Sequence, residues 1–133
     1  DLKGAQLQGA QLQGADFRNA CLANADLRGA NLRDAKLGGC DLRDANMGPL
    51  VLNNDRLMPA HLTGANMRYA DLRGADLRHA VLTGIDGAYA NFIGANMRQA
   101  DFSHAVLTGA QITHSSFRET VFDGATGVKL ITR

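Results

Sequence analysis

The chain repeats one small and one large apolar residue every five positions along almost its whole length. Alanine occupies 19 of the 26 positions whose numbers are multiples of five. Of the 27 positions that lie two residues after these, counted from Leu2 onward, 15 hold Leu, five Phe, three Met and one Ile. Neither a helix, with its period of 3.6, nor a plain strand, with its period of two, keeps this pattern on one face. A fixed short period predicts a solenoid of stacked coils.

Each five-residue repeat begins at the alanine position, so the large apolar residue is its third position. In extended backbone the first and third positions face the same side, which points the small and the large residue inward and the second and fourth positions outward. The fifth position holds 11 of the chain's 15 glycines. Because glycine tolerates backbone conformations that other residues avoid, we expect the chain to bend there and close into coils that stack at strand spacing.

Residues 65–84 read ANMRY ADLRG ADLRH AVLTG, and residues 25–34 read ADLRG ANLRD. These phrases resemble the A(D/N)LXX motif of the pentapeptide-repeat family, and the resemblance extends over nearly all 133 residues. The resemblance implies an all-β fold: a right-handed, four-sided parallel β-helix with four repeats in each coil. With four repeats per coil, the 133 residues would make one solenoid domain, 1–133, of six to seven coils.

Two stretches, 48–60 and 85–89, depart from the repeat. The first, GPLVLNNDRLMPA, contains two prolines that cannot donate to a backbone ladder and a polar run that favours a turn. It forms either a distorted coil, with the inward Asp55 capping a turn, or a projecting recognition loop of about ten residues, since loops on rigid scaffolds often carry function. In the second, Gly87 takes a third position, and we expect Ile85 to fill the space beside it. The candidate residues of a recognition loop are Pro49, Asn53, Asn54, Asp55, Arg56, Met58 and Pro59.

Ten of the eleven arginines occupy the fourth, outward position of the repeat. Asp76 lies two residues before Arg78 and can neutralise it. Arg98 and Arg118 lie twenty and forty residues after Arg78, so the three are expected to stack in one column. Asn96 and Ser116 take the place of the aspartate before Arg98 and Arg118. This column is either a solvated face or a stripe that binds an acidic protein or another anion. With twenty residues in each coil, the arginines expected to form the column are Arg78, Arg98, Arg118 and, farther along, Arg18.

Composition and residue placement argue against several classes of chemistry. The four histidines do not recur at the twenty-residue spacing, and no cysteine joins them, so we expect no metal site, no cofactor and no catalytic group. Cys40 takes an inward position and Cys21 an outward one, so a disulfide is not expected and a reducing compartment such as the cytoplasm is favoured. No run of 18 apolar residues predicts a membrane span.

Three functions compete on this sequence. The first is a non-enzymatic scaffold that docks another protein on its flat faces, with an end-to-end homodimer as a further option. The second, implied by the resemblance, is mimicry of DNA to bind or protect a type II topoisomerase such as DNA gyrase. It needs a strongly acidic face, whereas the net charge here is +1. The third, an enzyme or small-molecule binder, lacks any set of converging groups. Nucleic acid is disfavoured because aspartates share the faces that carry the arginines.

Overall fold

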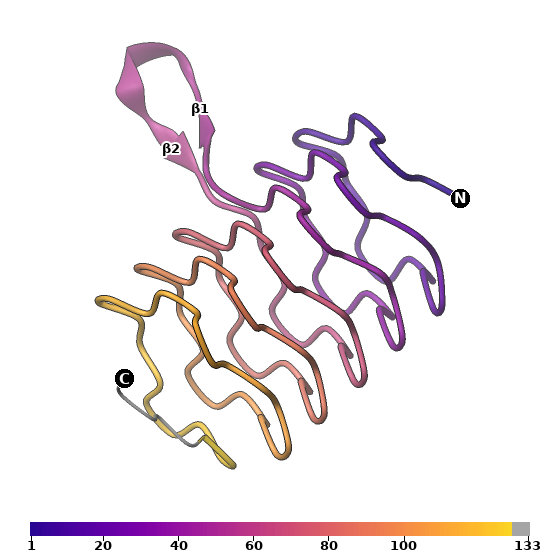
Figure 1. Ribbon diagram of the computed structural model, residues 1–133. Coiled ribbons are helices and arrows are strands. Elements are labelled where there is room, and N and C mark those ends of the chain that lie inside the picture. Colours follow the sequence, from indigo (N-terminus) through magenta and orange to yellow (C-terminus); the bar gives the residue numbers. More distant parts are fainter. Residues whose placement is uncertain (129–133) are drawn as a thin grey trace.

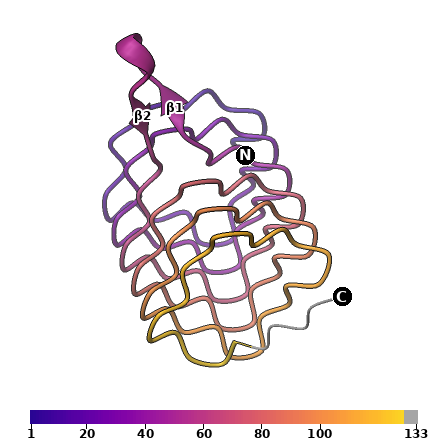
Figure 2. The same ribbon diagram turned by 90° about the vertical axis from the view of Figure 1, so that its left-hand side faces the viewer.

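The computed structural model describes residues 1–128 and shows a solenoid of stacked coils from which one hairpin projects (Figure 1). Residues at the second position of the repeat form parallel bridges with residues twenty positions farther along, such as Gln6 with Asp26 and Asp76 with Asn96. Twenty residues are four repeats, so each coil has four short sides and four bends, as Figure 2 shows along the stack. The expected four repeats per coil are therefore observed.

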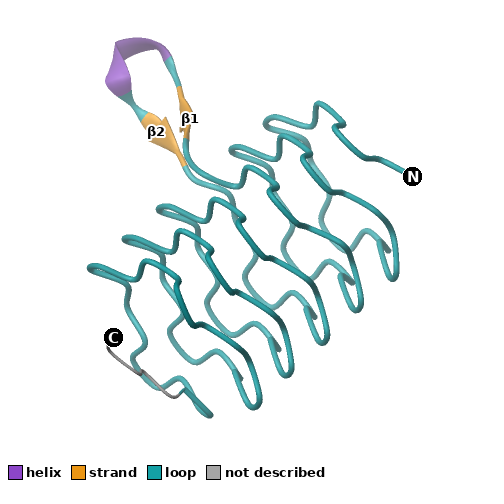
Figure 3. Ribbon diagram, viewed as in Figure 1, coloured by secondary structure: helices purple, strands orange, loops and turns teal. Residues whose placement is uncertain are grey.

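Backbone hydrogen bonds tie each coil to the next, and the amide and the carbonyl of a second-position residue both bond to the preceding coil. The amide of Asp26 donates to the carbonyl of Ala5 at 2.8 Å, and the amide of Leu7 donates to the carbonyl of Asp26 at 2.8 Å. Each straight piece is so short that the pairing remains a single bridge and forms no continuous strand (Figure 3). Within residues 1–128 the only strands are those of the hairpin, β1 (Leu50–Val51) and β2 (Leu57–Met58).

The first and third positions fill the interior, as the sequence predicts. Leu72 and Phe92 are fully buried on adjacent coils, and the partly buried Ile112 follows one coil later on the same inner side. No polar or charged residue is buried in the described part of the chain. Because burying one such large apolar side chain is worth about 1.5–3 kcal/mol, this column supplies most of the stabilisation.

The fifth position provides the bends. Its glycines have φ values near +70°, and Asn, Asp, His, Tyr, Gln and Glu at the same position adopt φ near +60°. Side chains at these corners lie against the next coil: a Cβ on Gly109 would meet the ring of Tyr89 at 2.5 Å. A glycine at the corner therefore allows the backbone to bend and also leaves room for the side chain of the preceding coil.

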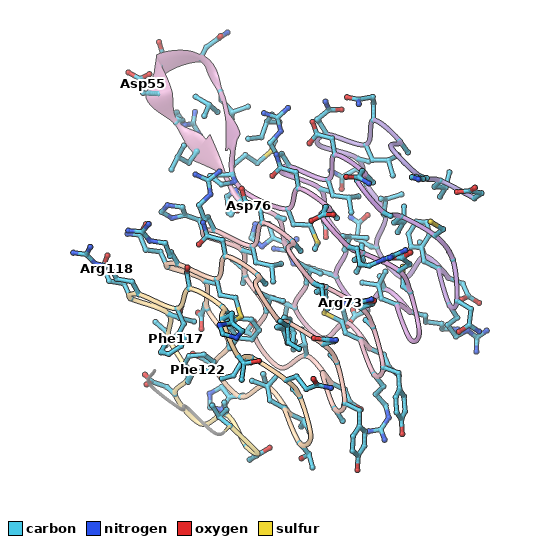
Figure 4. The ribbon with its side chains drawn as sticks, in the orientation of Figure 1. Asp55, Arg73, Asp76, Phe117, Arg118 and Phe122 are labelled. Carbon is cyan, nitrogen blue, oxygen red and sulfur yellow. The ribbon has the colours of Figure 1, made fainter. Side chains whose placement is uncertain are left out.

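Residues 48–60 form a projecting hairpin, so the predicted projection is confirmed and the distorted coil is wrong, whereas a role of the hairpin in recognition stays a prediction. β1 pairs with β2 in antiparallel fashion, and the 3-10 turn η1 (Asn53–Asp55) joins them (Figure 3). Asn31 bridges to His61 across thirty residues instead of twenty, so the hairpin inserts ten residues at a single bend. Asp55, placed inward by the five-residue count, is exposed near the tip (Figure 4). A turn at the end of a hairpin leaves no inward position for it.

The ten inserted residues change which side chains stack. Residues before the hairpin align with residues thirty positions later, so Arg28 and Gly48, and not Arg18, share the column of Arg78. The prediction that Arg18 extends the arginine column is therefore wrong. Arg18 lies instead in the column of Gly38 and Arg68. The estimate of six to seven coils likewise counted as solenoid ten residues that leave the stack.

In the second irregular stretch, residues 85–89, a larger residue at one inward position compensates for a smaller residue at the next. Ile85 is fully buried at a first position, and its Cδ1 atom would lie 3.3 Å from a Cβ added to Gly87. The isoleucine fills the space that the glycine leaves, as expected from the sequence, together with Leu107, whose Cδ2 would lie 3.0 Å from the same Cβ. Among residues 1–128 no helix has the length and apolar character that crossing a bilayer requires.

We expect Gly109→Ala to lower the free energy of unfolding by about 1 kcal/mol more than Gly94→Ala. Both glycines have positive φ, so alanine pays a similar backbone cost of ~1–2 kcal/mol at either site. Only at Gly109 does the new Cβ meet the Tyr89 ring, whose stacking is worth about 0.5–1.5 kcal/mol. Urea denaturation measures the difference. In a Tyr89→Ala background the two glycine substitutions should cost the same, and a persisting gap would contradict the steric explanation.

Replacing Pro49–Pro59 by one glycine should leave the solenoid folded, with a free energy of unfolding within about 1 kcal/mol of the original. Gly48, the new residue and Ala60 then occupy the fourth, fifth and first positions, so the regular bend is restored. Urea denaturation and circular dichroism measure the outcome. Loss of the folded state would mean that the hairpin is an integral part of the stack.

Candidate interaction surface

Aspartate and arginine form bidentate pairs along the outer faces. In each pair the Asp stands at the second position and the Arg at the fourth, so both side chains point outward from one short segment. In the example of Asp41 and Arg43, Nη2 donates to Oδ2 at 2.7 Å, while Nε and the backbone amide donate to Oδ1 at 2.9 and 3.1 Å. The same geometry joins Asp16–Arg18, Asp26–Arg28, Asp71–Arg73 and Asp76–Arg78.

Hydrogen bonds from the arginine side chain lower the pKa of Asp16, Asp26, Asp41 and Asp71. Hydrogen bonds from the Arg43 side chain hold the pKa of Asp41 at about 2, and those from the Arg18 side chain do the same for Asp16. Both pairs are largely exposed to solvent, where an ion pair is worth ~0–1 kcal/mol. The pairs therefore neutralise the faces more than they stabilise the fold.

In the column that contains Arg78, the two later arginines, Arg98 and Arg118, differ from the paired ones in their surroundings. Arg78 is bound by Asp76, as the sequence predicts. Asn96 stands at the corresponding place before Arg98, and its Oδ1 accepts only the backbone amide of Arg98 at 3.3 Å. Within residues 1–128 no ion pair forms at Arg98 or Arg118, and both side chains are exposed. The C-terminal part of this column therefore carries excess positive charge.

The hairpin rises from the same edge of the solenoid. Gly48, which lies in the arginine column beside Arg78, leads directly into it, and Figure 4 shows Asp76 near the foot of the hairpin and Arg118 on the C-terminal side. At its base Leu50 and Met58 pack over Gly29, whose missing Cβ would lie 3.0 and 3.4 Å from their side chains. The absence of a side chain at Gly29 thus makes room for the hairpin.

The predicted loop residues separate into a base and a tip. Pro49, Met58 and Pro59 are half-buried at the base. The tip, Asn53–Asp55 with Arg56, is exposed, and Asn54 and Asp55 adopt positive φ, as turn residues of this type readily do. The outer side of the hairpin adds three exposed apolar side chains that the sequence analysis did not single out, namely Val51, Leu52 and Leu57.

A stacked tyrosine pair was also missed by the sequence analysis. The rings of Tyr69 and Tyr89 lie 5.1 Å apart at their centroids with an angle of 13° between their planes, and both are exposed. The sequence could have predicted this pair, because both tyrosines occupy the fifth position of the repeat and are separated by the twenty residues of one coil.

Three further titratable side chains within residues 1–128 are those of His61, Cys40 and Cys21. Nδ1 of His61 lies 3.3 Å from Nη2 of Arg33. Burial and the nearby guanidinium group lower the pKa of His61. Cys40 is buried, which raises the pKa of its thiol to about 12, and Cys21 lies outside the core, so both are free thiols as predicted. No group of three or more potential metal ligands gathers in the described part of the chain.

Comparison with known proteins identifies the repeat. A family model described as pentapeptide repeats, in eight copies, matches residues 1–19, 10–48, 60–86 and 88–124, which leaves out most of the hairpin. None of the curated protein sequences matches the chain.

Several solved structures are similar to the chain. HetL, a pentapeptide repeat protein involved in heterocyst differentiation regulation in the cyanobacterium Nostoc sp., is 31% identical over 92% of this chain and 62% of its own, with a TM-score of 0.60. Rfr23 from the cyanobacterium Cyanothece is 27% identical over 84% and 63%, with a TM-score of 0.45. QnrB1, a plasmid-mediated fluoroquinolone resistance protein, is 17% identical over 90% and 71%, with a TM-score of 0.43. The chain thus spans about three fifths of the length of HetL and Rfr23.

Acid should reduce the contribution of the aspartate–arginine pairs. The pKa of Asp41 is depressed in the folded state, so its stabilisation is present above its unfolded value of about 4 and is lost as the pH falls toward 2. We expect the free energy of unfolding of Asp41→Asn, measured in urea from pH 5 to pH 2, to decrease less than that of the original chain, by under about 1 kcal/mol. Parallel pH profiles would contradict this account.

Proposed function

The chain belongs to the pentapeptide-repeat family, and from that premise we propose that it is a non-enzymatic interaction module that binds another protein along its hairpin edge. The hairpin edge consists of residues 49–59 together with Arg78, Arg98 and Arg118. Family membership also implies the right-handed sense of the four-sided β-helix. A stack of this kind is filled by its own side chains and presents rigid outer surfaces, which suits docking better than enclosing a substrate.

Two exceptions to the repeat lie at the same edge of the solenoid, and this observation carries the proposal. The hairpin interrupts an otherwise regular stack and exposes apolar side chains, with Val51 at 63% and Leu57 at 48%. Beside it, Arg98 and Arg118 lack the ion pair that Arg78 makes. Exposed apolar side chains next to unpaired arginines are typical of protein-binding surfaces, in which arginine is enriched.

The charge of this edge favours a partner with acidic groups. Arg98 and Arg118 follow Arg78 at the coil spacing of ~4.8 Å. Because they lack the carboxylate that Asp76 provides for Arg78, their guanidinium groups repel each other unless an anion lies between them. A partner that places carboxylates along the column would relieve this repulsion, and its apolar side chains would cover Val51 and Leu57.

The observed charges do not favour the DNA-mimic alternative. Mimicry of DNA needs rows of unpaired carboxylates, whereas the aspartates at 16, 26, 41, 71 and 76 are each bound by the arginine two residues later. An interaction module agrees better with HetL, a relative whose described role is regulatory.

We expect Arg98→Ser/Arg118→Ser to weaken partner binding about tenfold at low salt while leaving folding unchanged. Two exposed charge contacts of up to ~1 kcal/mol each allow an effect of this size, and it should shrink in 0.5 M salt because exposed charges are screened. Immobilised protein captures the partner from an extract of the source cells, and titration calorimetry with the purified partner then measures the affinity.

The matched control is Arg43→Ser/Arg73→Ser. It also removes two positive charges from adjacent coils, but from another face and from arginines that are already paired. It should retain the partner, whereas the variant with one glycine in place of Pro49–Pro59 should lose it. Equal binding by all the variants at low salt would exclude the hairpin edge as the docking surface.

A further inference from the structure

Tyr69 and Tyr89 lie on the edge of the solenoid diagonally opposite the hairpin. Two bends, at Gly64 and at Tyr69, follow the hairpin within its coil, so the tyrosines are half a coil away from it. Tyr69 is 63% exposed and Tyr89 47%. Two stacked aromatic rings open to solvent are typical of binding surfaces, where tyrosine is enriched.

The two rings are held in place by their surroundings. The Tyr89 ring lies against the bare backbone of Gly109, and Tyr69 stacks on its other face. The Arg68 guanidinium approaches the Tyr89 ring to 5.8 Å from its centroid. Both tyrosines have φ near +60°, a conformation that is costly for a bulky residue. A conformational cost of this kind, here on two adjacent coils, is often found at functional sites.

The column of corner side chains has one gap, on the free side of Tyr69. The preceding coil carries Gly38 and Gly39 at this place and so contributes no side chain. The coil before that carries Asn19, whose side-chain oxygen lies over Gly39. One coil level between the Asn19 amide and the Tyr69 ring is therefore without a side chain. A planar group placed there would stack on Tyr69 within the range of about 4.5–7 Å at which aromatic pairs interact.

The neighbouring charges are already compensated. Arg68 forms an ion pair with Asp86 at 3.3 Å, and Arg18 forms one with Asp16 at 2.7 Å. Neither arginine is free to hold a phosphate, which disfavours a nucleotide. A guanidinium from a partner would also meet Arg68 beside the ring. An uncharged aromatic side chain fits this gap best.

We propose that the gap beside Tyr69 binds an aromatic side chain of a partner protein, which stacks on the free face of the Tyr69 ring, between that ring and the Asn19 amide that lies over Gly39. This site is separate from the hairpin edge and does not depend on the function proposed for it. With both edges in use, the solenoid would hold two partners on opposite sides.

A blocked pentapeptide with a central tryptophan tests the proposal directly. The chain contains no tryptophan, so tryptophan fluorescence reports the probe alone, and nuclear magnetic resonance locates the contact. We expect saturable binding with shifts centred on Tyr69, Gly39 and Asn19. The same peptide with leucine in place of tryptophan should bind roughly tenfold more weakly, because it cannot stack.

Two variants remove the site in opposite ways. Tyr69→Ala deletes the stacking surface, and Gly39→Asn fills the gap with a residue that tolerates positive φ; each should weaken tryptophan-peptide binding roughly tenfold. Gly94→Asn, at a corner with open space, and the glycine replacement of the hairpin should bind as the original chain does. The proposal fails if no saturable shift occurs at Tyr69, if Gly39→Asn binds unchanged, or if adenosine monophosphate binds there more tightly than the peptide.

Discussion

Every outward feature of this molecule depends on the axial hydrogen bonds that tie each coil to the next. The amide and the carbonyl at the second position both bond to the preceding coil, and the carbonyl at the first position and the amide at the third bond to the following coil. These bonds hold the coils in register while the first and third positions fill the interior. This arrangement leaves only the second, fourth and fifth positions outside. The surface is therefore a set of columns, and the character of each column follows from which residues the ladder places one above another.

The hairpin shows how much disturbance the ladder tolerates. The insertion enters and leaves at a bend, where the chain already turns outward, and the bridges resume immediately afterward, between Asn31 and His61 and between Asp41 and Asp71. Glycine at position 29 provides the floor for its base. A projecting element thus adds an apolar surface without removing a buried residue from the core, and it does so beside the arginines that lack carboxylate partners.

The two candidate binding edges arise from the same rule of corner side chains. At five corners of the described residues a side chain of the preceding coil lies against a glycine, as Tyr89 does against Gly109. At the hairpin edge the corner residue is replaced by a whole hairpin, and at the tyrosine edge Gly39 leaves one place in the column empty. Both are local departures from the repeat, whereas pairs such as Asp41–Arg43 and Asp71–Arg73 neutralise charge on another face, and for this reason we propose binding at these edges and not on the flat faces.

The sequence by itself determined the five-residue period, the inward and outward positions, the bends and the exchange of volume between Ile85 and Gly87. These follow from local backbone geometry and side-chain size, which the order of residues states directly. It left open whether residues 48–60 leave the stack, and it placed Arg18 in the wrong column. The insertion is ten residues long, two whole repeats, so alanines and leucines stay in phase on both sides of it and the phase of the repeat does not reveal that the coils are offset by half a turn. Only the tertiary structure decided which coils pair across the hairpin, because stacking is set by long-range hydrogen bonds that a change of half a coil redirects without altering the local repeat.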